Sequence, residues 1–261
     1  MKSHQAAVLV KGLIEEGEAF RRLGADLAVP TPSKQARRGR GFHIGMSVAF
    51  LVTAFAGFAP TYYLKGLSHA PALSPGLHLH GAVFTAWLLL LFAQTALVAA
   101  HRVDLHRRLG IAGAILAAMM VPLGMMTAIA GAQRGSTRPG FEPMGFMIFP
   151  FGQVVLFAIF IGAALWNRRR SELHRRLVLV ATACLMTPAI TRLPFVGQRP
   201  ILSLGLSALF VVAGMLHDWK SRGRVHPVYV KSVLVILLSG PARFALGQTA
   251  AWQSFARFLA G

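Results

Sequence analysis

The sequence predicts an all-α fold, a polytopic bundle of about seven transmembrane helices with a cytoplasmic N-terminus. Three observations lead to this prediction. The chain of 261 residues is 55% hydrophobic. It contains several apolar runs of about 20 residues, the length of helix that crosses a hydrocarbon layer of about 30 Å. Its charges lie in short basic segments between these runs, and two of those segments repeat one another.

Residues 1–41 are predicted to form a cytoplasmic segment that is amphipathic at first and basic at its end. Apolar residues spaced among charges from Val8 to Leu27 form a rough helical stripe suited to a membrane surface. The stretch "PTPSKQARRGRG" indicates a basic linker broken by Pro and Gly. The start of the chain lacks the apolar core and cleavage site of a signal peptide, so we expect the first spanning helix to direct insertion.

The transmembrane domain is predicted over residues 42–247, and a short outer-face tail over residues 248–261. Apolar runs define its spans. They are placed at about 42–63, 79–100, 109–131, 146–166, 177–192, 201–217 and 227–246. The fifth and sixth are short for a bilayer, and the sequence does not fix their boundaries.

The distribution of basic residues orients these helices. The chain has 27 Lys and Arg against 8 Asp and Glu, and most of the basic residues fall in residues 1–41, "HRVDLHRR", "NRRRSELHRR" and "DWKSRGRV". These segments lie on one side of the predicted spans, which the positive-inside rule makes the cytoplasmic side. The clustering predicts anionic lipid at that face as the partner of the charge, and no nucleic acid.

Two of the basic segments follow one pattern. "VDLHRRLG" at 103–110 and "SELHRRLV" at 171–178 place an acidic residue and a histidine at the same two positions, and "RGRVHPVY" at 222–229 repeats the histidine more loosely. In the predicted topology, each segment follows a helix that runs from the outer face to the cytoplasmic face and precedes a helix that runs back to the outer face. The domain is therefore predicted to consist of three similar hairpins added to the first helix, an arrangement that can place a binding site between the repeats.

Several histidines gather at the predicted cytoplasmic face, namely His101, His106, His174, His217 and His226. Histidine pairs from facing helices hold haem in membrane b-type cytochromes, although those ligands lie within the bilayer. The alternative is structural. Asp104 and Glu172 suit the start of a helix by capping and by attraction to the helix dipole, so the repeated segment would be a helix cap.

One predicted helix carries a sparse polar stripe. Steps of seven residues from His80 reach Trp87, Gln94 and His101, so these side chains share one helical face with a drift of about 20° per heptad. The functional interpretation is that the stripe faces the bundle interior and lines a cofactor or substrate site. The alternative is that the histidines are interfacial end residues and that Gln94 is a hydrogen-bonding residue between packed helices.

A metal site at the outer face is a further hypothesis, with His69, His78 and His80 as its ligands. Neutral imidazole binds copper, zinc and haem iron, and thioether ligands are available from Met125, Met126, Met144 and Met147. Residues two apart point about 200° apart on a helix, so both His78 and His80 bind one metal only if the helix begins at or after His80. We expect His78 to lie in the preceding loop. Solvated histidines and core methionines are the alternative.

Arg192 and Arg243 lie in apolar surroundings near the outer ends of their predicted helices. Burying a guanidinium is costly unless an anion meets it, and no acidic residue falls inside a predicted span. A lipid phosphate, a haem propionate or a substrate carboxylate is therefore a candidate partner. Snorkelling to the outer interface is the alternative.

Several kinds of chemistry are excluded by the sequence. The scarcity of carboxylates removes di-iron sites, paired glycosidase acids and acidic proton relays. The single cysteine, Cys184, excludes an intrachain disulfide and a thiolate metal cluster. Common hydrolase, metalloprotease and nucleotide-binding motifs are missing from the sequence.

The stretch "HLHGAVFTAWLLLLFAQ", followed by "RVDLHRRLG", resembles a family of uncharacterised bacterial multi-helix inner-membrane proteins over most of residues 42–246. This resemblance implies a multi-pass protein of the bacterial inner membrane and supplies no activity. The histidines at helix ends are also faintly similar to those of cytochrome b561-like proteins, but the chain lacks their mid-helix ligand placement.

The leading hypothesis from the sequence is a membrane-embedded redox or cofactor-handling protein whose site lies near the outer face. His80, joined by His78, would act as ligand or proton-exchanging group, Trp87 and Gln94 would line the site, and the two outer arginines would hold an anionic group. Haem, a quinone or copper would be the cofactor. Two other classes stay open: a small-anion transporter or channel, and a non-catalytic accessory subunit of a membrane complex. A homo-oligomer also fits the sequence.

Overall fold

The computed structural model describes residues 34–67, 72–137, 140–197 and 199–261. The chain divides into two units, Met1–Arg37 and Arg38–Gly261, and the architecture reported below is that of the second unit. The amphipathic stripe predicted for residues 1–30 lies outside the described residues, as does His69. The described part of the chain is helical and contains no strand.

Helices account for nearly all of the second unit. Long helices alternate with short connections, and three spans combine a long helix with a short one. The helices are α2 (Lys34–Phe58), η1 (Ala59–Tyr63), η2 (Lys65–Leu67), α3 (Pro75–Ala99), α4 (Val103–Gln133), α5 (Pro143–Phe146), α6 (Ile148–Trp166), α7 (Ser171–Cys184), α8 (Thr187–Ile190), α9 (Pro200–Arg222), α10 (Pro227–Gly247) and α11 (Ala250–Ala260).

Seven helical segments are long and apolar enough to cross a membrane, as the sequence predicted. They are Gly39–Tyr63, Pro75–Ala99, Val103–Gln133, Pro143–Trp166, Ser171–Ile190, Leu202–Arg222 and Pro227–Gly247. A helix satisfies its backbone hydrogen bonds internally, which is what a segment in hydrocarbon requires. The chain is therefore a multi-pass integral membrane protein with an all-α fold.

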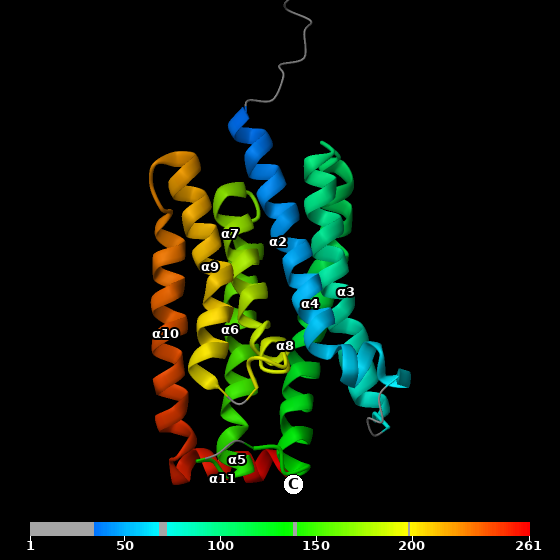
Figure 1. Ribbon diagram of the computed structural model, residues 1–261, viewed down its shortest axis with the longest axis vertical. Helices are drawn as coiled ribbons and strands as arrows, with labels where there is room; N and C mark the ends of the chain where they lie inside the picture. The colour runs from blue at the N-terminus through cyan, green and yellow to red at the C-terminus, as the bar shows by residue number, and fades with distance from the viewer. Residues whose placement is uncertain (1–33, 68–71, 138–139, 198) are drawn as a thin grey trace, which may run out of the picture. The chain divides into compact units, whose positions relative to one another are not determined.

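The spans run alternately up and down the bundle, and their connections gather at its two ends (Figure 1). We call one the basic end: it holds the connections between α3 and α4, between α6 and α7, and between α9 and α10. We call the other the α11 end, because α10 ends there and α11 lies across it. The C-terminal segment predicted as a tail is thus largely the helix α11, which Thr249 caps by accepting a hydrogen bond from the Trp252 amide at 3.2 Å.

One error of the sequence prediction at helix boundaries concerns the start of α3. This helix begins at Pro75, because the Ser74 hydroxyl accepts a hydrogen bond from the Leu77 amide at 3.4 Å and Pro75 has the backbone angle of a first helical residue. His78 therefore lies in the first turns of the helix, and its expected placement in the loop is wrong. Because α3 begins before His78, both His78 and His80 are helical, which bears on the proposed metal site.

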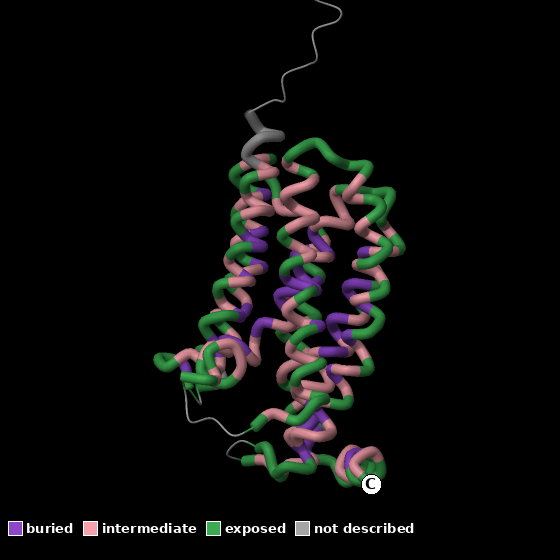
Figure 2. Tube along the Cα trace, turned by 90° about the vertical axis from the view of Figure 1, so that its right-hand side faces the viewer, coloured by how far each residue is buried: buried purple, intermediate pink, exposed green. Residues whose placement is uncertain are grey.

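The middle of the bundle is formed by α6 and α7, whose buried residues appear in purple in Figure 2. In the α7–α8 span, 61% of the residues in its apolar 18-residue stretch are buried. In α10, 11% of the corresponding stretch is buried. Many exposed side chains of α10 are large and apolar, including Leu234, Leu238 and Phe244. Such a surface suits lipid, where apolar exposure carries no penalty.

Close approach between α2 and α8 depends on a glycine. A Cβ atom added at Gly57 would lie 2.1 Å from the carbonyl oxygen of Ala189, so only a residue without a side chain lets these backbones meet. Small residues at such crossings are typical of helices packed in membranes. Gly45, on the same helix, has open space around the corresponding position.

We expect Gly57→Ala to lower the free energy of unfolding by about 1–3 kcal/mol, because the added methyl group forces α2 away from α8. Gly45→Ala is the matched control and should not lower stability. The measurement is the thermal unfolding midpoint of the detergent-purified protein. Equal midpoints for the two variants would contradict the contact.

Candidate functional site

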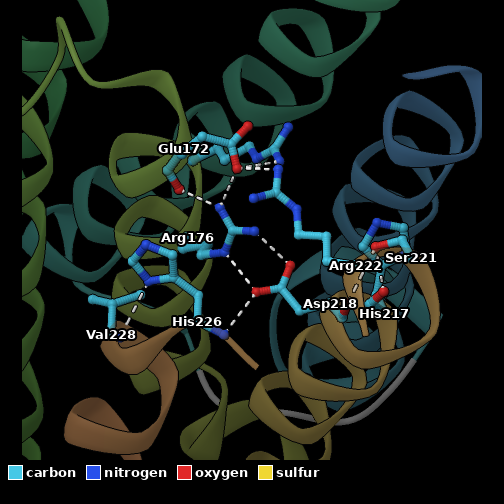
Figure 3. A network of polar contacts seen from close by, with 9 residues as sticks. Glu172, Arg176, His217, Asp218, Ser221, Arg222, His226 and Val228 are labelled. Carbon is cyan, nitrogen blue, oxygen red and sulfur yellow. Dashed lines mark hydrogen bonds and ion pairs between the residues drawn. The ribbon is translucent and has the colours of Figure 1, made fainter. Parts of the chain in front are cut away.

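The basic end contains the main ion-pair network of the described chain, centred on Arg176 of α7. Its guanidinium makes a two-pronged contact with Asp218 of α9, with Nε donating to Oδ2 at 2.8 Å and Nη2 donating to Oδ1 at 2.5 Å (Figure 3). The two side chains are 1% and 4% exposed. Breaking such a pair on one side leaves a buried charge without compensation, which is strongly destabilising. The pair therefore fastens α7 to α9.

Glu172 extends the network toward the surface. Arg176 donates through Nη1 to the Glu172 backbone carbonyl at 2.6 Å and to Oε2 at 2.8 Å. The same carboxylate oxygen pairs with Arg175 at 2.8 Å and with Arg222. Glu172 is 44% exposed, so these contacts are accessible from outside the bundle.

The acidic residues of the repeated segments are not hydrogen-bonding helix caps. The N-cap positions of α4 and α7 are Arg102 and Arg170, and neither makes a side-chain capping bond. Asp104 instead pairs with Arg102 at 3.6 Å, and Glu172 pairs with its arginines. Both carboxylates still lie in a first turn, where the helix dipole favours negative charge.

His226 is a helix cap at the basic end. Its Nδ1 accepts a hydrogen bond from the Val228 amide at 3.2 Å at the start of α10, and its own amide donates to Asp218 at 3.2 Å. Burial and the nearby positive charge of Arg176 lower the pKa of His226 below its ordinary value of 6.5. Protonation of Nδ1 would remove the acceptor and break the cap.

The other histidines of the basic end serve mainly as packing and hydrogen-bonding groups. The His217 ring stacks on Phe42 at 4.1 Å between centroids, and His43 lies 6.4 Å from His217 in an edge-on arrangement. Nδ1 of His174 lies 2.8 Å from the Ala164 carbonyl. These contacts connect α2 to α9 and α7 to α6.

The polar stripe of α3 is partly confirmed and is shorter than predicted. Trp87 is buried, donates through Nε1 to the Thr182 hydroxyl at 3.3 Å, and meets Phe157 edge-on at 5.5 Å. Gln94 contacts α4: in the amide orientation that satisfies both ends, its nitrogen donates to Nδ1 of His106 at 2.6 Å and its oxygen accepts from the Gly110 amide at 3.0 Å. Both residues therefore join helices, as amides in membranes often do.

His101 does not belong to this stripe. The helix ends at Ala99, and His101 follows with a φ of 60°. Its amide donates to the Val98 carbonyl and the Arg102 amide donates to the Leu97 carbonyl, which is the Schellman pattern of a helix end. The sequence prediction counted His101 as helical because its spacing from Gln94 is one heptad.

His80 is the stripe residue that is left with an unused polar atom. Its ring contacts Phe84 at 4.1 Å between centroids and lies beside the Leu123 carbonyl of α4. Nδ1 of this ring is enclosed and has no hydrogen-bond partner. Arg192 lies near enough for its positive charge to act on the imidazole. The structure thus brings together two of the residues singled out in the sequence.

The helical placement of His78 and His80 argues against one metal ion shared by the two residues. Both residues are helical, so their side chains point to different faces of α3 and do not meet at one ion. His78 is exposed and lies 6.0 Å from the Tyr62 ring. Across the described ranges no group of three or more His, Cys, Asp or Glu side chains has metal-binding geometry. Met144 and Met147 lie in a small apolar cluster with α11 residues.

Arg192 and Arg243 have backbone acceptors. Arg243 of α10 donates to the Ser239 carbonyl at 3.0 Å and to the Phe149 carbonyl of α6 at 3.1 Å. Arg192 donates to the Pro188 carbonyl at 2.6 Å and lies over the Phe58 ring, 4.7 Å from its centroid. These carbonyl oxygens use part of the hydrogen-bonding capacity of both guanidiniums. The placement of Arg192 and Arg243 in apolar surroundings therefore does not by itself require a bound anion.

The sequence prediction missed Arg176 and Asp218, which the structure makes the centre of the basic end. Both were read as members of cytoplasmic basic segments. The available signal was the sequence position of Asp218, one of only 8 acidic residues, at the end of an apolar helix. An acid at that depth needs a cation on a neighbouring helix.

Comparisons of the chain with models of protein families, with curated proteins and with solved structures gave no match.

Asp218→Asn should lower the free energy of unfolding by about 3–5 kcal/mol, because it leaves the Arg176 charge buried without its partner. The double variant Arg176→Met with Asp218→Leu should be more stable than either single variant, because it removes both charges. Asp104→Asn breaks an exposed pair and should cost about 0–1 kcal/mol. Chemical or thermal unfolding in detergent compares these variants with the wild type, and a double variant less stable than both Arg176→Met and Asp218→Leu alone would refute this account.

The protein should become less stable as the pH decreases, because His226 is harder to protonate in the folded state than in the unfolded state. The folded state has the lower pKa, so below about 6.5 the unfolded state binds the proton more readily; the contribution is fully present above that pH and is lost as the pH decreases. His226→Asn keeps a capping side chain without the titration. The drop in melting midpoint between pH 7.5 and 5.5 should therefore be larger for the wild type than for His226→Asn. Identical drops would rule out this role.

Proposed function

We propose that this integral membrane protein handles a quinone-type redox cofactor bound at His80. The single observation that carries the proposal is the enclosed Nδ1 atom of His80, which has no hydrogen-bond partner. Leaving a buried polar atom unsatisfied costs about 1–3 kcal/mol. A ligand that hydrogen-bonds there removes this cost, so the site is prepared for a polar group carried by an otherwise apolar molecule.

The chemistry of a quinone fits the residues around this atom. Its ring is flat and apolar, and its two carbonyl oxygens accept hydrogen bonds. Each oxygen gains a proton on reduction, and an imidazole both donates and accepts protons near neutral pH. Because the other ring nitrogen of His80 lies beside the Leu123 carbonyl, Nδ1 would accept a hydrogen bond from a hydroxyl of the reduced quinone and exchange that proton.

The neighbouring side chains support the same ligand class. Phe84 lies against the His80 ring, and Phe58 lies beneath the Arg192 guanidinium, so aromatic faces are available on α3 and on α2. The positive charge of Arg192 favours an electron-rich carbonyl oxygen beside His80. Trp87, one heptad along α3, is already bonded to Thr182 and forms the inner boundary of the site.

The other cofactors and classes receive less support from these contacts. Copper would need at least two converging ligands, and His78 points away from His80. Haem held by two imidazoles would need a second histidine facing His80, and His78 is the other described histidine at this end. An anion pathway would need arginines without protein acceptors, whereas Arg243 bonds to two carbonyl oxygens.

The orientation and membrane of the protein are part of the proposal. The positive-inside rule places the basic end, with the N-terminus, in the cytoplasm. His80 would then lie toward the outer face of a bacterial inner membrane, within reach of quinones dissolved in the bilayer. We expect the lipid phase to be the route by which the ligand enters.

The test is a titration of the detergent-purified protein with decyl-benzoquinone in its reduced form, against decanol as a control for the tail. The quinone should raise the melting midpoint of the wild type. His80→Ala should weaken binding by about tenfold, the equivalent of one hydrogen bond at roughly 1.4 kcal/mol. His78→Ala, an exposed position on the same helix, is the matched control and should bind normally.

Three results would overturn the proposal. Decanol could give the same shift as the quinone, or His80→Ala could bind as tightly as His78→Ala. The third is a Soret band or stoichiometric copper in the purified protein that disappears in His80→Ala. That last result would assign the site to haem or to metal.

A further inference from the structure

We infer that the basic end contains a specific site for the phosphate of an anionic lipid headgroup, formed by Arg175 and Arg222. The starting observation is crowding at one oxygen atom. The guanidiniums of Arg175, Arg176 and Arg222 all contact Oε2 of Glu172. A single carboxylate oxygen does not satisfy three such groups, each of which offers several N–H donors.

The charges of the network are unequal in number. Asp218 is engaged by Arg176 on both of its oxygens (Figure 3). Glu172 is left to balance Arg175 and Arg222. Within the described residues the other acidic side chains are Asp104, which pairs with Arg102, and Glu142, which precedes α5 at the opposite end. The network therefore carries excess positive charge, and the exposed residues Arg168, Arg169 and Arg170 adjoin it.

One donor in this network is unsatisfied. Nε of Arg175 is enclosed and has no hydrogen-bond partner. The Arg175 and Arg222 side chains are 35% and 34% exposed, whereas Arg176 is 1% exposed. A ligand can therefore reach the first two and not the third. A phosphate group offers several oxygen acceptors in the geometry that guanidinium groups bind best.

The position of the site relative to the bilayer favours a lipid as the source of this phosphate. Trp166 and Trp219 lie at the same end, and their side chains are 87% and 58% exposed. Exposed tryptophans collect at the level of lipid headgroups. Trp219 is within one helical turn of Arg222, so the guanidiniums lie at the depth of the lipid phosphates.

This inference is independent of the proposed quinone site, which lies at the other end of the spans and uses other residues. It also differs from a diffuse attraction between basic loops and a charged membrane. A diffuse attraction would weaken by a similar amount whichever basic residue is removed. A built site depends on two particular arginines.

The experiment titrates the full chain in nonionic detergent with short-chain phosphatidylglycerol, with phosphatidylcholine of the same chains, and with inorganic phosphate. Melting midpoints report binding. Phosphatidylglycerol should raise the midpoint of the wild type. Arg175→Gln and Arg222→Gln should each weaken its binding by about tenfold, because each removes charge-assisted hydrogen bonds. Arg169→Gln removes the same charge from an exposed neighbour and should change binding less than twofold.

Glu172→Gln gives a second test that folding defects do not imitate. Neutralising this carboxylate frees Arg175 and Arg222, so the variant should bind phosphatidylglycerol more tightly than the wild type even if it melts at a lower temperature without lipid. An equal loss of binding in Arg169→Gln, or unchanged binding in both Arg175→Gln and Arg222→Gln, would overturn the site. Inorganic phosphate producing the full shift alone would overturn the lipid assignment and make free phosphate the ligand.

Discussion

The structure depends on the absence of water from the hydrocarbon layer, which obliges every polar group inside it to find a partner in the protein. The helices meet this requirement for the backbone. Among side chains, Trp87 meets it through Thr182, and Gln94 through the first turns of α4. Arg243 meets it through carbonyl oxygens of α10 and α6. Each of these side chains bonds to a neighbouring helix, so the hydrogen bonds that satisfy the polar groups also hold the helices together.

An enclosed polar atom needs a partner near the membrane surface as well as within the hydrocarbon layer, and two such atoms of the described chain are exceptions. At His80 and at Arg175 an enclosed nitrogen atom has no partner. The two exceptions lie toward opposite ends of the spans and differ in chemistry. The His80 ring packs against Phe84, which suits an uncharged ligand with a hydrogen-bonding oxygen. Arg175 belongs to a cluster with excess positive charge, which suits a phosphate. The bundle between them is closed by the apolar contacts of α6 and α7.

Sequence reasoning located the spans well and the contacts poorly. Hydropathy is a local property, so the seven apolar segments follow from composition and length, and the short fifth span is lengthened at its start, where α7 begins at Ser171. Helix ends depend on single hydrogen bonds. The Ser74 cap moved His78 into α3, and the Schellman pattern at His101 ended the polar stripe early. The spacing of the histidines in the sequence does not predict where these two helix ends fall.

The sequence by itself determined that this chain is a multi-pass membrane protein with basic connections and few acids, because those properties are sums over residues. It also singled out His80 and Arg192, whose residue types are rare in apolar runs. Only the tertiary structure decided which polar groups meet. Arg176 and Asp218 are 42 residues apart and were read as loop charges, yet they form the buried pair between α7 and α9. Partnership across helices depends on packing that no local pattern encodes, so the groups left without partners appear only in the folded chain.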